Sequence, residues 1–396
     1  MQENIPYMQG EAIQGPATST RRAGSYQRQL AGFRAFIPAR LPPTPPVSIT
    51  GSLQRLLSEA DLALGRLDGS ISILPNPDLF VLMYVRKEAV LSSQIEGTQS
   101  SLQDLLAAEA KLNIPESPRD VDEVINYVGA MNHGLRRLPD FPVSVRLIGE
   151  IHAELLKGVR GSNLTPGELR VSQNWIGHSG STLQNALFVP PPPDMVPQAL
   201  GDLERFIQED NELPPLIRIG LAHAQFETIH PFLDGNGRIG RLLITFLLMH
   251  SGVLRKPVLY LSYFLKQHRS AYYELLQDIR EKGNWEGWLA FFLRGISEVS
   301  AQAAETAHNI VVQREEARSL IADELGRAAG NGYRILEHLY GRPIVSVNGI
   351  QALLKVTYPS ANQLVERLQS IGVLQEITGQ ARNRRFRYDA YVRLFD

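Results

Sequence analysis

The stretch from His230 to Arg241 constrains this chain more strongly than any other segment. It reads His-Pro-Phe-Leu-Asp-Gly-Asn-Gly-Arg-Ile-Gly-Arg and continues into an apolar run over 242–249. The apolar run predicts a buried helix, so residues 235–237 stand where the first backbone N–H groups lack helical partners. Glycine lets the backbone approach a ligand closely, and a helix start with free N–H groups attracts anions. The sequence therefore predicts an anion site at a helix start.

The side chains of this stretch suit a polyphosphate and a metal ion. Arg238 and Arg241 are three residues apart, so both can face one anion on the first helical turn. Asp234 offers the hard oxygen that Mg²⁺ prefers when it also binds substrate phosphates. His230 has a pKa range suited to taking a proton from an attacking hydroxyl group.

A metal site of a different kind is the alternative for these residues. His223, His230 and Asp234 contain suitable ligand atoms, but Pro231 and the loop interrupt any simple helical ligand spacing. We therefore favour the polyphosphate interpretation. The histidines on the predicted helices are interpreted as ordinary core or surface residues: His133, His152 and His223.

The stretch resembles the signature of the Fic family at every fixed position. That signature is His-Pro-Phe, one free residue, Asp or Glu, Gly-Asn-Gly-Arg, two free residues and Arg. The family transfers AMP from ATP to a hydroxyl side chain of a protein target. The resemblance implies a base at His230, a Mg²⁺ ligand at Asp234 and a loop anchor at Phe232. It also implies a phosphate site built from Gly235, Asn236, Gly237, Arg238 and Arg241.

Composition sets wider limits on the class of protein. The chain has 396 residues, 43% of them apolar and 20% charged, with a formal net charge of −1. This length allows two or three domains, and the near-zero charge gives no overall attraction to nucleic acid or an anionic membrane. The absence of cysteine excludes disulfides and thiolate sites. We find neither a signal peptide nor a membrane-spanning run, and so expect a cytoplasmic protein with no membrane partner.

A second motif lies at the end of a helix predicted over about 79–94. Its residues are Ser92, Glu96 and Gly97. A glycine after a helix-terminal glutamate is typical of a C-cap, which by itself would leave Glu96 as a solvated surface carboxylate. The segment also resembles the inhibitory-helix motif of the Fic family. The resemblance implies that Glu96 pairs with Arg241 and takes the place of the γ-phosphate of ATP.

Two further segments are assigned to the site through the same resemblance. Residues 170–177 and 186–189 have an extended pattern on either side of a polar turn, which predicts a β-hairpin. By itself such a hairpin is a scaffold, but in the family it is a flap that aligns the target by strand addition, here near Ile176 and Gly177. Tyr272 and Tyr273 lie on a helix where adjacent side chains cannot share a face. They either serve the core or, as in the family, line the adenine and ribose end of the pocket.

The fold class expected is mainly α: a Fic-type helical bundle with a β-hairpin flap, plus a C-terminal winged helix-turn-helix domain. A helix that begins at Ser52 is expected to end at Gly65 and the following turn, which contains Gly69. The C-terminal domain is expected to contain helices over 335–340, 347–354 and 360–369, and Ser360 is expected to cap the last of them. The divisions predicted are a flexible lead (1–34), a helical region with the inhibitory helix (35–112), the catalytic core (113–300), a linker helix (301–328) and the winged-helix domain (329–396).

The C-terminal domain leaves DNA open as a partner. Asn362, Gln363 and Arg367 fall on its expected recognition helix, and residues 382–387 supply the arginines of a basic wing. Such modules contact phosphates, or serve only as protein-contact surfaces. Glu366 on the same helix and the near-neutral chain weaken the case for DNA.

The sequence therefore favours an autoinhibited protein adenylyltransferase that uses Mg²⁺ and ATP. Its target would be a Ser, Thr or Tyr hydroxyl on another protein or on itself, and the resemblance adds a homodimer as an expectation. Two alternatives stay open: a Fic enzyme that removes AMP, since Glu96 is present, and a DNA-binding transcriptional regulator with a nucleotide-sensing Fic portion.

Overall fold

The computed structural model describes residues 21–395, apart from 73, 75, 113–117, 119, 179 and 210–211. The flexible lead predicted over 1–34 lies outside the described residues as far as residue 20. From Gly24 the chain instead forms a β-hairpin, β1 (Gly24–Arg28) and β2 (Arg34–Pro38), paired antiparallel. Arg22 anchors it through two 2.7 Å contacts with the carboxylate of Glu286. The expectation of a flexible lead is thus wrong for this part, because a buried ion pair and the buried ring of Phe36 tie the hairpin to the core.

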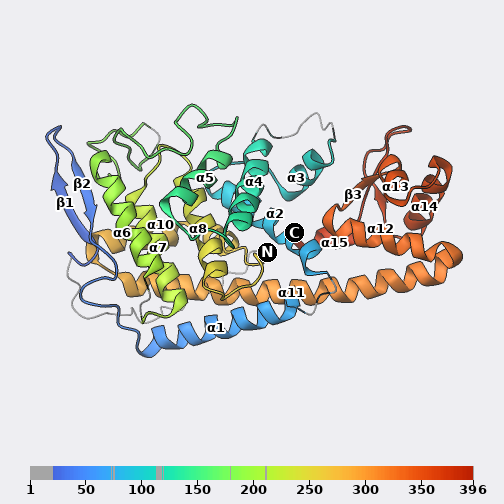
Figure 1. Ribbon diagram of the computed structural model, residues 1–396, viewed down its shortest axis with the longest axis horizontal. Coiled ribbons are helices and arrows are strands. Elements are labelled where there is room, and N and C mark those ends of the chain that lie inside the picture. Colours follow the sequence, from blue (N-terminus) through green and yellow to red (C-terminus); the bar gives the residue numbers. More distant parts are fainter. Residues whose placement is uncertain are drawn as a thin grey trace, which may run out of the picture.

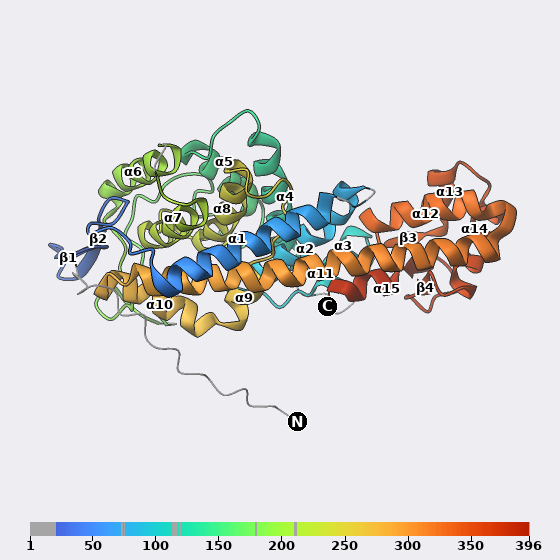
Figure 2. The same cartoon turned by 90° about the horizontal axis from the view of Figure 1, so that it is seen from below.

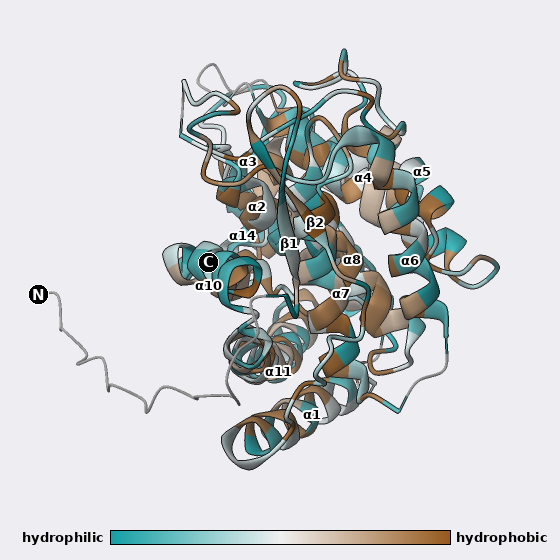
Figure 3. Ribbon diagram, turned by 90° about the vertical axis from the view of Figure 1, so that its left-hand side faces the viewer, coloured by the Kyte–Doolittle hydropathy of each residue, from teal (hydrophilic) through white to brown (hydrophobic). Residues whose placement is uncertain are grey.

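The stretch from His230 to Arg241 joins two central helices, and both helices are buried along almost their whole length. These are α7 (Pro215–Ile229) and α8 (Asn236–His250). A helix that is hydrophobic on all sides has to lie inside a bundle. Brown, hydrophobic segments recur on both helices within the bundle in Figure 3. The surrounding helices are α2 (Pro77–Ile95), α3 (Leu102–Glu109), α4 (Val121–Arg137), α5 (Val145–Leu155), η1 (Pro193–Met195), α6 (Val196–Gln208), α9 (Ser262–Gln267) and α10 (Arg269–Lys282).

Two long helices run side by side along the bundle. Helix α1 (Gly51–Ser72) packs against α11 (Trp285–Leu325), as Figures 1 and 2 show. The prediction that the first helix ends near Gly65 and Gly69 is wrong, because the apolar stripe continues to Leu67 and Ile71, both buried. A helical glycine costs about 1 kcal/mol. Burying a leucine or isoleucine returns about 1.5–3 kcal/mol, which is enough to carry the helix through both glycines.

The C-terminal unit combines helices with a small sheet. It contains η2 (Gly326–Ala328), α12 (Ala329–Gly341), β3 (Ile344–Ser346), α13 (Val347–Leu354), α14 (Tyr358–Ser370), β4 (Gln375–Glu376), β5 (Arg385–Arg387), α15 (Asp389–Val392) and η3 (Arg393–Phe395). The strand order is β3-β5-β4, antiparallel throughout. The cap predicted at Ser360 is wrong: Thr357 caps α14 and accepts a hydrogen bond from the Ser360 N–H. The winged helix-turn-helix assignment stays a prediction.

Several polar side chains expected to face DNA are bonded within the protein. Arg384 donates to the Asn362 side chain at 2.8 Å, and Asn362 donates to Glu366 at the same distance. Arg367 donates to the carbonyl oxygen of Glu324, which lies on α11. The same side chains could contact phosphates only if these bonds broke, or through N–H groups that take no part in them. DNA binding therefore stays a prediction.

Candidate functional site

Helix α7 ends at Ile229, and the left-handed backbone of its C-cap, His230, turns the chain into the motif loop. His230 has φ 49° and ψ 61°, and its N–H donates to the Phe226 carbonyl at 2.9 Å. The following Pro231 has no N–H and cannot extend the helix. His230 consequently stands directly after a buried helix.

Two residues of the predicted flap segment hold the backbone of this loop. Arg170 is buried and donates from Nε to the His230 carbonyl at 2.9 Å, while its own N–H donates to the Pro231 carbonyl at 2.9 Å. The Asn174 amide donates to the Phe232 carbonyl at 2.8 Å. The sequence analysis missed both roles, since neither residue belongs to the motif and their partners are backbone atoms.

His152 of α5 supports the other side of the loop. Its ring stacks on Phe232 with centroids 3.8 Å apart. Nδ1 accepts from the Gly167 N–H at 2.8 Å, so Nε2 carries the hydrogen and donates to the Asp234 carbonyl at 3.0 Å. Burial lowers the pKa of His152 to about 4 and keeps the ring neutral. The interpretation of His152 as an ordinary histidine therefore missed its role in positioning the loop.

This neutral His152 predicts a dependence of stability on pH. Its folded pKa of about 4 lies below the usual 6.5, so between these values the unfolded chain binds more protons. The free energy of unfolding should therefore fall as pH drops from 6.5 towards 4. We expect that His152→Gln reduces this slope by up to about 1.4 kcal/mol per pH unit. Denaturant titrations of both proteins across this range measure it, and identical slopes would contradict the assignment.

Helix α8 begins after Gly235, which is its N-cap at φ 78°. The Asn236 side chain is buried and turned back into the loop: its Oδ1 accepts from the Phe232 N–H and its Nδ2 donates to the Phe232 carbonyl, both at 2.8 Å. Asn236 thus closes the loop with its side chain.

The two motif arginines are paired with different glutamates. Arg241 contacts Glu96 Oε1 at 2.6 Å from Nη2, and its Nε donates to Ser92 Oγ at 2.8 Å. Arg238 contacts Glu123 Oε2 of α4 at 3.0 Å. Burial opposes ionisation of Glu96, yet the charge and hydrogen bond of Arg241 hold the pKa of Glu96 below its usual value. Both guanidinium groups are buried, so each depends on its carboxylate for charge compensation.

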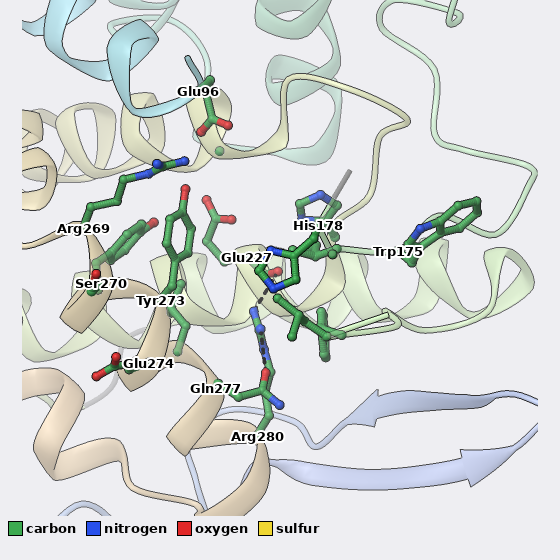
Figure 4. Close-up of a pocket in the computed structure, with 18 of the residues that line it drawn as sticks. Glu96, Trp175, His178, Glu227, Arg269, Ser270, Tyr273, Glu274, Gln277 and Arg280 are labelled. Atoms are coloured by element: carbon green, nitrogen blue, oxygen red, sulfur yellow. Dashed lines mark hydrogen bonds between the residues drawn. The ribbon is translucent and has the colours of Figure 1, made fainter. Parts of the chain in front are cut away.

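One pocket, of about 830 Å³, gathers most of the predicted site residues (Figure 4). It is lined by Glu96, Ile176, Gly177, His230, Gly237, Arg241, Tyr272 and Tyr273, among others. Tyr272 is buried and donates to His223, whereas Tyr273 is 40% exposed, so one tyrosine of the pair serves the core and the other faces the pocket. Asp234, Gly235, Asn236, Arg238, Ser92 and Gly97 lie outside its lining.

The predicted flap reaches the pocket but forms less sheet than expected. Residues 170–177 and 186–189 form no strands; a single antiparallel bridge joins Ile176 and Phe188 through hydrogen bonds of 2.8 and 3.0 Å. The extended pattern wrongly predicted two paired strands, because Arg170 and Asn174 donate hydrogen bonds to the motif loop. The bridge still brings Ile176 and Gly177 to the pocket.

Asp234 fits the type of residue that holds Mg²⁺. Its Oδ1 accepts from the Gly235 N–H at 2.7 Å and lies 3.8 Å from Arg238, and the side chain is about one-third exposed. One such carboxylate together with substrate phosphates is a usual Mg²⁺ environment. The rival metal triad is not formed in the described part of the chain, where no group of three ligand side chains occurs. His223 uses Nδ1 on the Gly240 carbonyl and Nε2 on Tyr272.

Sequence reasoning missed several pocket residues that the fold brings in from other helices. They are His178, Glu227, Arg269, Gln277 and Arg280. Glu227 carried a usable signal: it is a carboxylate in a mostly apolar predicted helix, one turn before His230. Arg280 had none, since its place depends on how α10 packs.

A mainly helical bundle in which the start of α8, His230 and Arg241 line one pocket indicates the class of protein, and comparison with known proteins agrees. Residues 54–136 match the Fic/DOC family N-terminal model, and residues 142–248 match the Fic/DOC family model. A solved structure of a Fic family protein from Desulfovibrio desulfuricans G20 covers 87% of this chain and 97% of that chain, with a TM-score of 0.58 and 21% identity. Residues 54–248 of this chain thus contain the two matched domains of the Fic/DOC family.

Curated relatives match over part of their length. The chain is 29% identical over 241 residues to protein adenylyltransferase fic-1 of Caenorhabditis briggsae, covering 58% of this chain and 44% of the relative. It is 29% identical over 256 residues to protein adenylyltransferase Fic of Culex quinquefasciatus, covering 63% and 46%. A probable protein adenylyltransferase of Aquifex aeolicus is 28% identical over 181 residues, covering 44% and 51%. The matched region thus spans about half of each relative.

No helix in the described ranges has the length and hydropathy needed to cross a membrane.

Proposed function

We propose that this protein transfers AMP from Mg·ATP to a hydroxyl group of a protein target. The observation that carries the proposal is the shared pocket, where His230, Arg241 and the start of α8 meet around a space large enough for a nucleotide. The carboxylate of Glu96 pairs with Arg241 in this pocket, where a phosphate would bind in the proposed reaction. The names of the curated relatives support the same activity.

In this proposal His230 is the base, because it lines the pocket next to the start of α8. Burial, followed by the positive charges of Arg280 and Arg170, lowers the pKa of His230 to about 3, so the imidazole is neutral and able to accept a proton. A bound polyphosphate adds negative charge, which raises this pKa and makes the ring a stronger base. As the hydroxyl oxygen bonds to the α-phosphorus, its proton passes to His230 and the bond to the β-phosphate breaks, releasing pyrophosphate.

The remaining residues bind and orient the nucleotide. Arg241 and the N–H groups at the start of α8 would neutralise phosphate oxygens, and Asp234 would hold Mg²⁺, which supplies charge neutralisation when bound. Tyr273 would contact the nucleoside end. The flap bridge at Ile176 would align a target segment by strand addition. The identity of the hydroxyl residue, a homodimer and a DNA partner stay predictions.

Autoinhibition by Glu96 is part of the proposal. Glu96 Oε1 would lie only 2.2 Å from a Cβ placed on Gly237, so the carboxylate rests directly on the backbone of the helix start. It also pairs with Arg241. The same groups cannot bind a terminal phosphate at the same time. Nucleotide would bind in a reactive pose only after Glu96 leaves.

The test uses ATP labelled at one phosphate at a time. Full-length Glu96→Gly protein is incubated with Mg²⁺, a cell extract and ATP carrying ³²P at the α or the γ position. AMP transfer retains the α label on protein and not the γ label. Mass spectrometry of the labelled band then gives the added group and its residue. Retention of γ label would show phosphoryl transfer and contradict the proposal, and absence of both labels would contradict group transfer to protein.

A further inference from the structure

A buried carboxyl group in the pocket has no part in the mechanism above. Glu227 lies on α7 one turn before His230, is 6% exposed and lines the pocket. Its Oε1 is buried and has no hydrogen-bond partner among the described residues. A buried polar atom without a partner costs about 1–3 kcal/mol, so an arrangement that keeps one next to a ligand pocket indicates a ligand partner.

The carboxyl group of Glu227 lies on the same face of α8 as that of Glu96. A Cβ on Gly240 would lie 2.3 Å from Glu227 Oε1, and a Cβ on Gly237 would lie 2.2 Å from Glu96 Oε1. Gly237 and Gly240 are three residues apart and therefore neighbours on the helix surface. Two carboxyl groups thus rest on successive turns, with Arg241 beside both. In the view of Figure 4, Glu227 lies between Tyr273 and His178 with its carboxyl group towards Glu96.

The charges around Glu227 come from three parts of the fold: α8, α10 and the C-terminal end of α2. Arg241 of α8 and Arg280 of α10 favour its ionised form, and Glu96 of α2 opposes it. Arg280 uses Nη2 on the Glu227 backbone carbonyl, at 3.2 Å. The other titratable neighbours are Tyr272 and Tyr273, with raised pKa values, and His230, with a lowered one, and none of these three titrates near neutral pH. Burial is the largest influence on Glu227 and raises its pKa to about 7.

We propose that Glu227 is a nucleotide-binding residue that acts in its protonated form, donating a hydrogen bond to a phosphate oxygen of the nucleotide. The position beside Arg241, the residue expected to bind phosphate, selects the polyphosphate over the nucleoside as its partner. An ionised Glu227 would instead repel the polyphosphate across a poorly solvated pocket. Nucleotide binding therefore takes up a proton when Glu227 is ionised in the free protein. This inference rests on the proposed function.

The experiment measures the Kd of Mg·ATP by calorimetry between pH 6 and 9. It compares Glu96→Gly with Glu96→Gly/Glu227→Gln, because glutamine keeps the donor but does not titrate. Removing Glu96 takes away a charge that raises the pKa of Glu227, so the titration in this background begins no higher than about pH 7. We expect the Kd of the Glu96→Gly protein to rise towards about tenfold per pH unit above that point. The Kd of the double variant should change little over the same range.

Three further arms separate donation from packing and from binding to the nucleoside. Glu96→Gly/Glu227→Met keeps the volume without the donor and should bind Mg·ATP about two- to tenfold more weakly than the glutamine variant. Adenosine, which has no phosphate, should bind the Glu96→Gly protein without the pH slope. Calorimetry of that protein at pH 8 in two buffers of different ionisation enthalpy should show uptake of one proton with Mg·ATP, and this arm needs no substitution at Glu227.

Four results would overturn the inference. They are parallel pH slopes for Glu96→Gly and Glu96→Gly/Glu227→Gln, equal Kd values for the glutamine and methionine variants, the same slope with adenosine, and no proton uptake. In these cases Mg·ATP still binds and the proposed function stands. A Glu96→Gly protein that is folded and binds no Mg·ATP at any pH would overturn both.

Discussion

Replacing Glu96 by glycine is expected to raise the initial rate of AMP transfer by about 10- to 100-fold. The carboxylate forms a 2.6 Å contact with Arg241 and rests on the backbone at Gly237. Hydrogen bonds to a charged group contribute about 1.5–3 kcal/mol, and a phosphate must overcome this before it binds. Each 1.4 kcal/mol is about a factor of ten in occupancy. The rate is measured with α-labelled ATP at subsaturating concentration.

The same substitution should lower stability and increase its response to nucleotide. Arg241 stays buried after Glu96 is removed, and an uncompensated buried charge destabilises the fold. We expect a lower Tm for Glu96→Gly without nucleotide, and a larger rise with Mg·ATP than in the unsubstituted protein.

Glu109→Gly is the matched control for this prediction. Glu109 also ends a helix and also pairs with an arginine, Arg86, at 2.8 Å, but it lies outside the pocket. It should leave the transfer rate and the nucleotide response nearly unchanged. An unchanged or lower rate for a folded Glu96→Gly protein, or an equal rise for Glu109→Gly, would argue against autoinhibition by Glu96.

Replacing His230 by alanine in the Glu96→Gly background is expected to reduce AMP transfer by about 10²- to 10⁴-fold, the usual contribution of a positioned general base. The loop backbone should persist, because Arg170 and Asn174 bind its carbonyl oxygens and not the imidazole. Mg·ATP should therefore still bind with little change in Kd, while kcat falls. Rates from α-labelled ATP and Kd values from calorimetry separate the two effects.

His133→Ala is the matched control for the base. His133 lies on α4 and pairs with Glu150 at 3.3 Å, outside the pocket. It should leave transfer intact. If His230→Ala protein still labels its target at the rate of the parent, the proposed mechanism is wrong; if it no longer binds Mg·ATP, the histidine has a role in binding that the geometry does not give it.

Sequence patterns located most helices because their buried faces recur at helical spacing. The predictions over 79–94, 347–354 and 360–369 correspond to α2, α13 and α14. The errors arose where tertiary contacts outweighed local preference. Helix α1 continues through two glycines because α11 covers its apolar stripe. The flap makes one bridge where two strands were predicted, because polar side chains in it bond to the motif loop.

The chemistry of the stretch His230 to Arg241 was determined by the sequence alone, since its functional groups are neighbours along the chain. A proline ends one helix and glycines begin the next, so the local sequence places the functional groups between α7 and the first turn of α8. Residues far apart in sequence are different. Arg241 and Glu96 are 145 positions apart, and periodicity does not specify how α2 packs on α8. The resemblance implied that pair. Only the tertiary structure placed the carboxyl groups of Glu227 and Glu96 against successive turns of α8, because it fixed which helix faces meet.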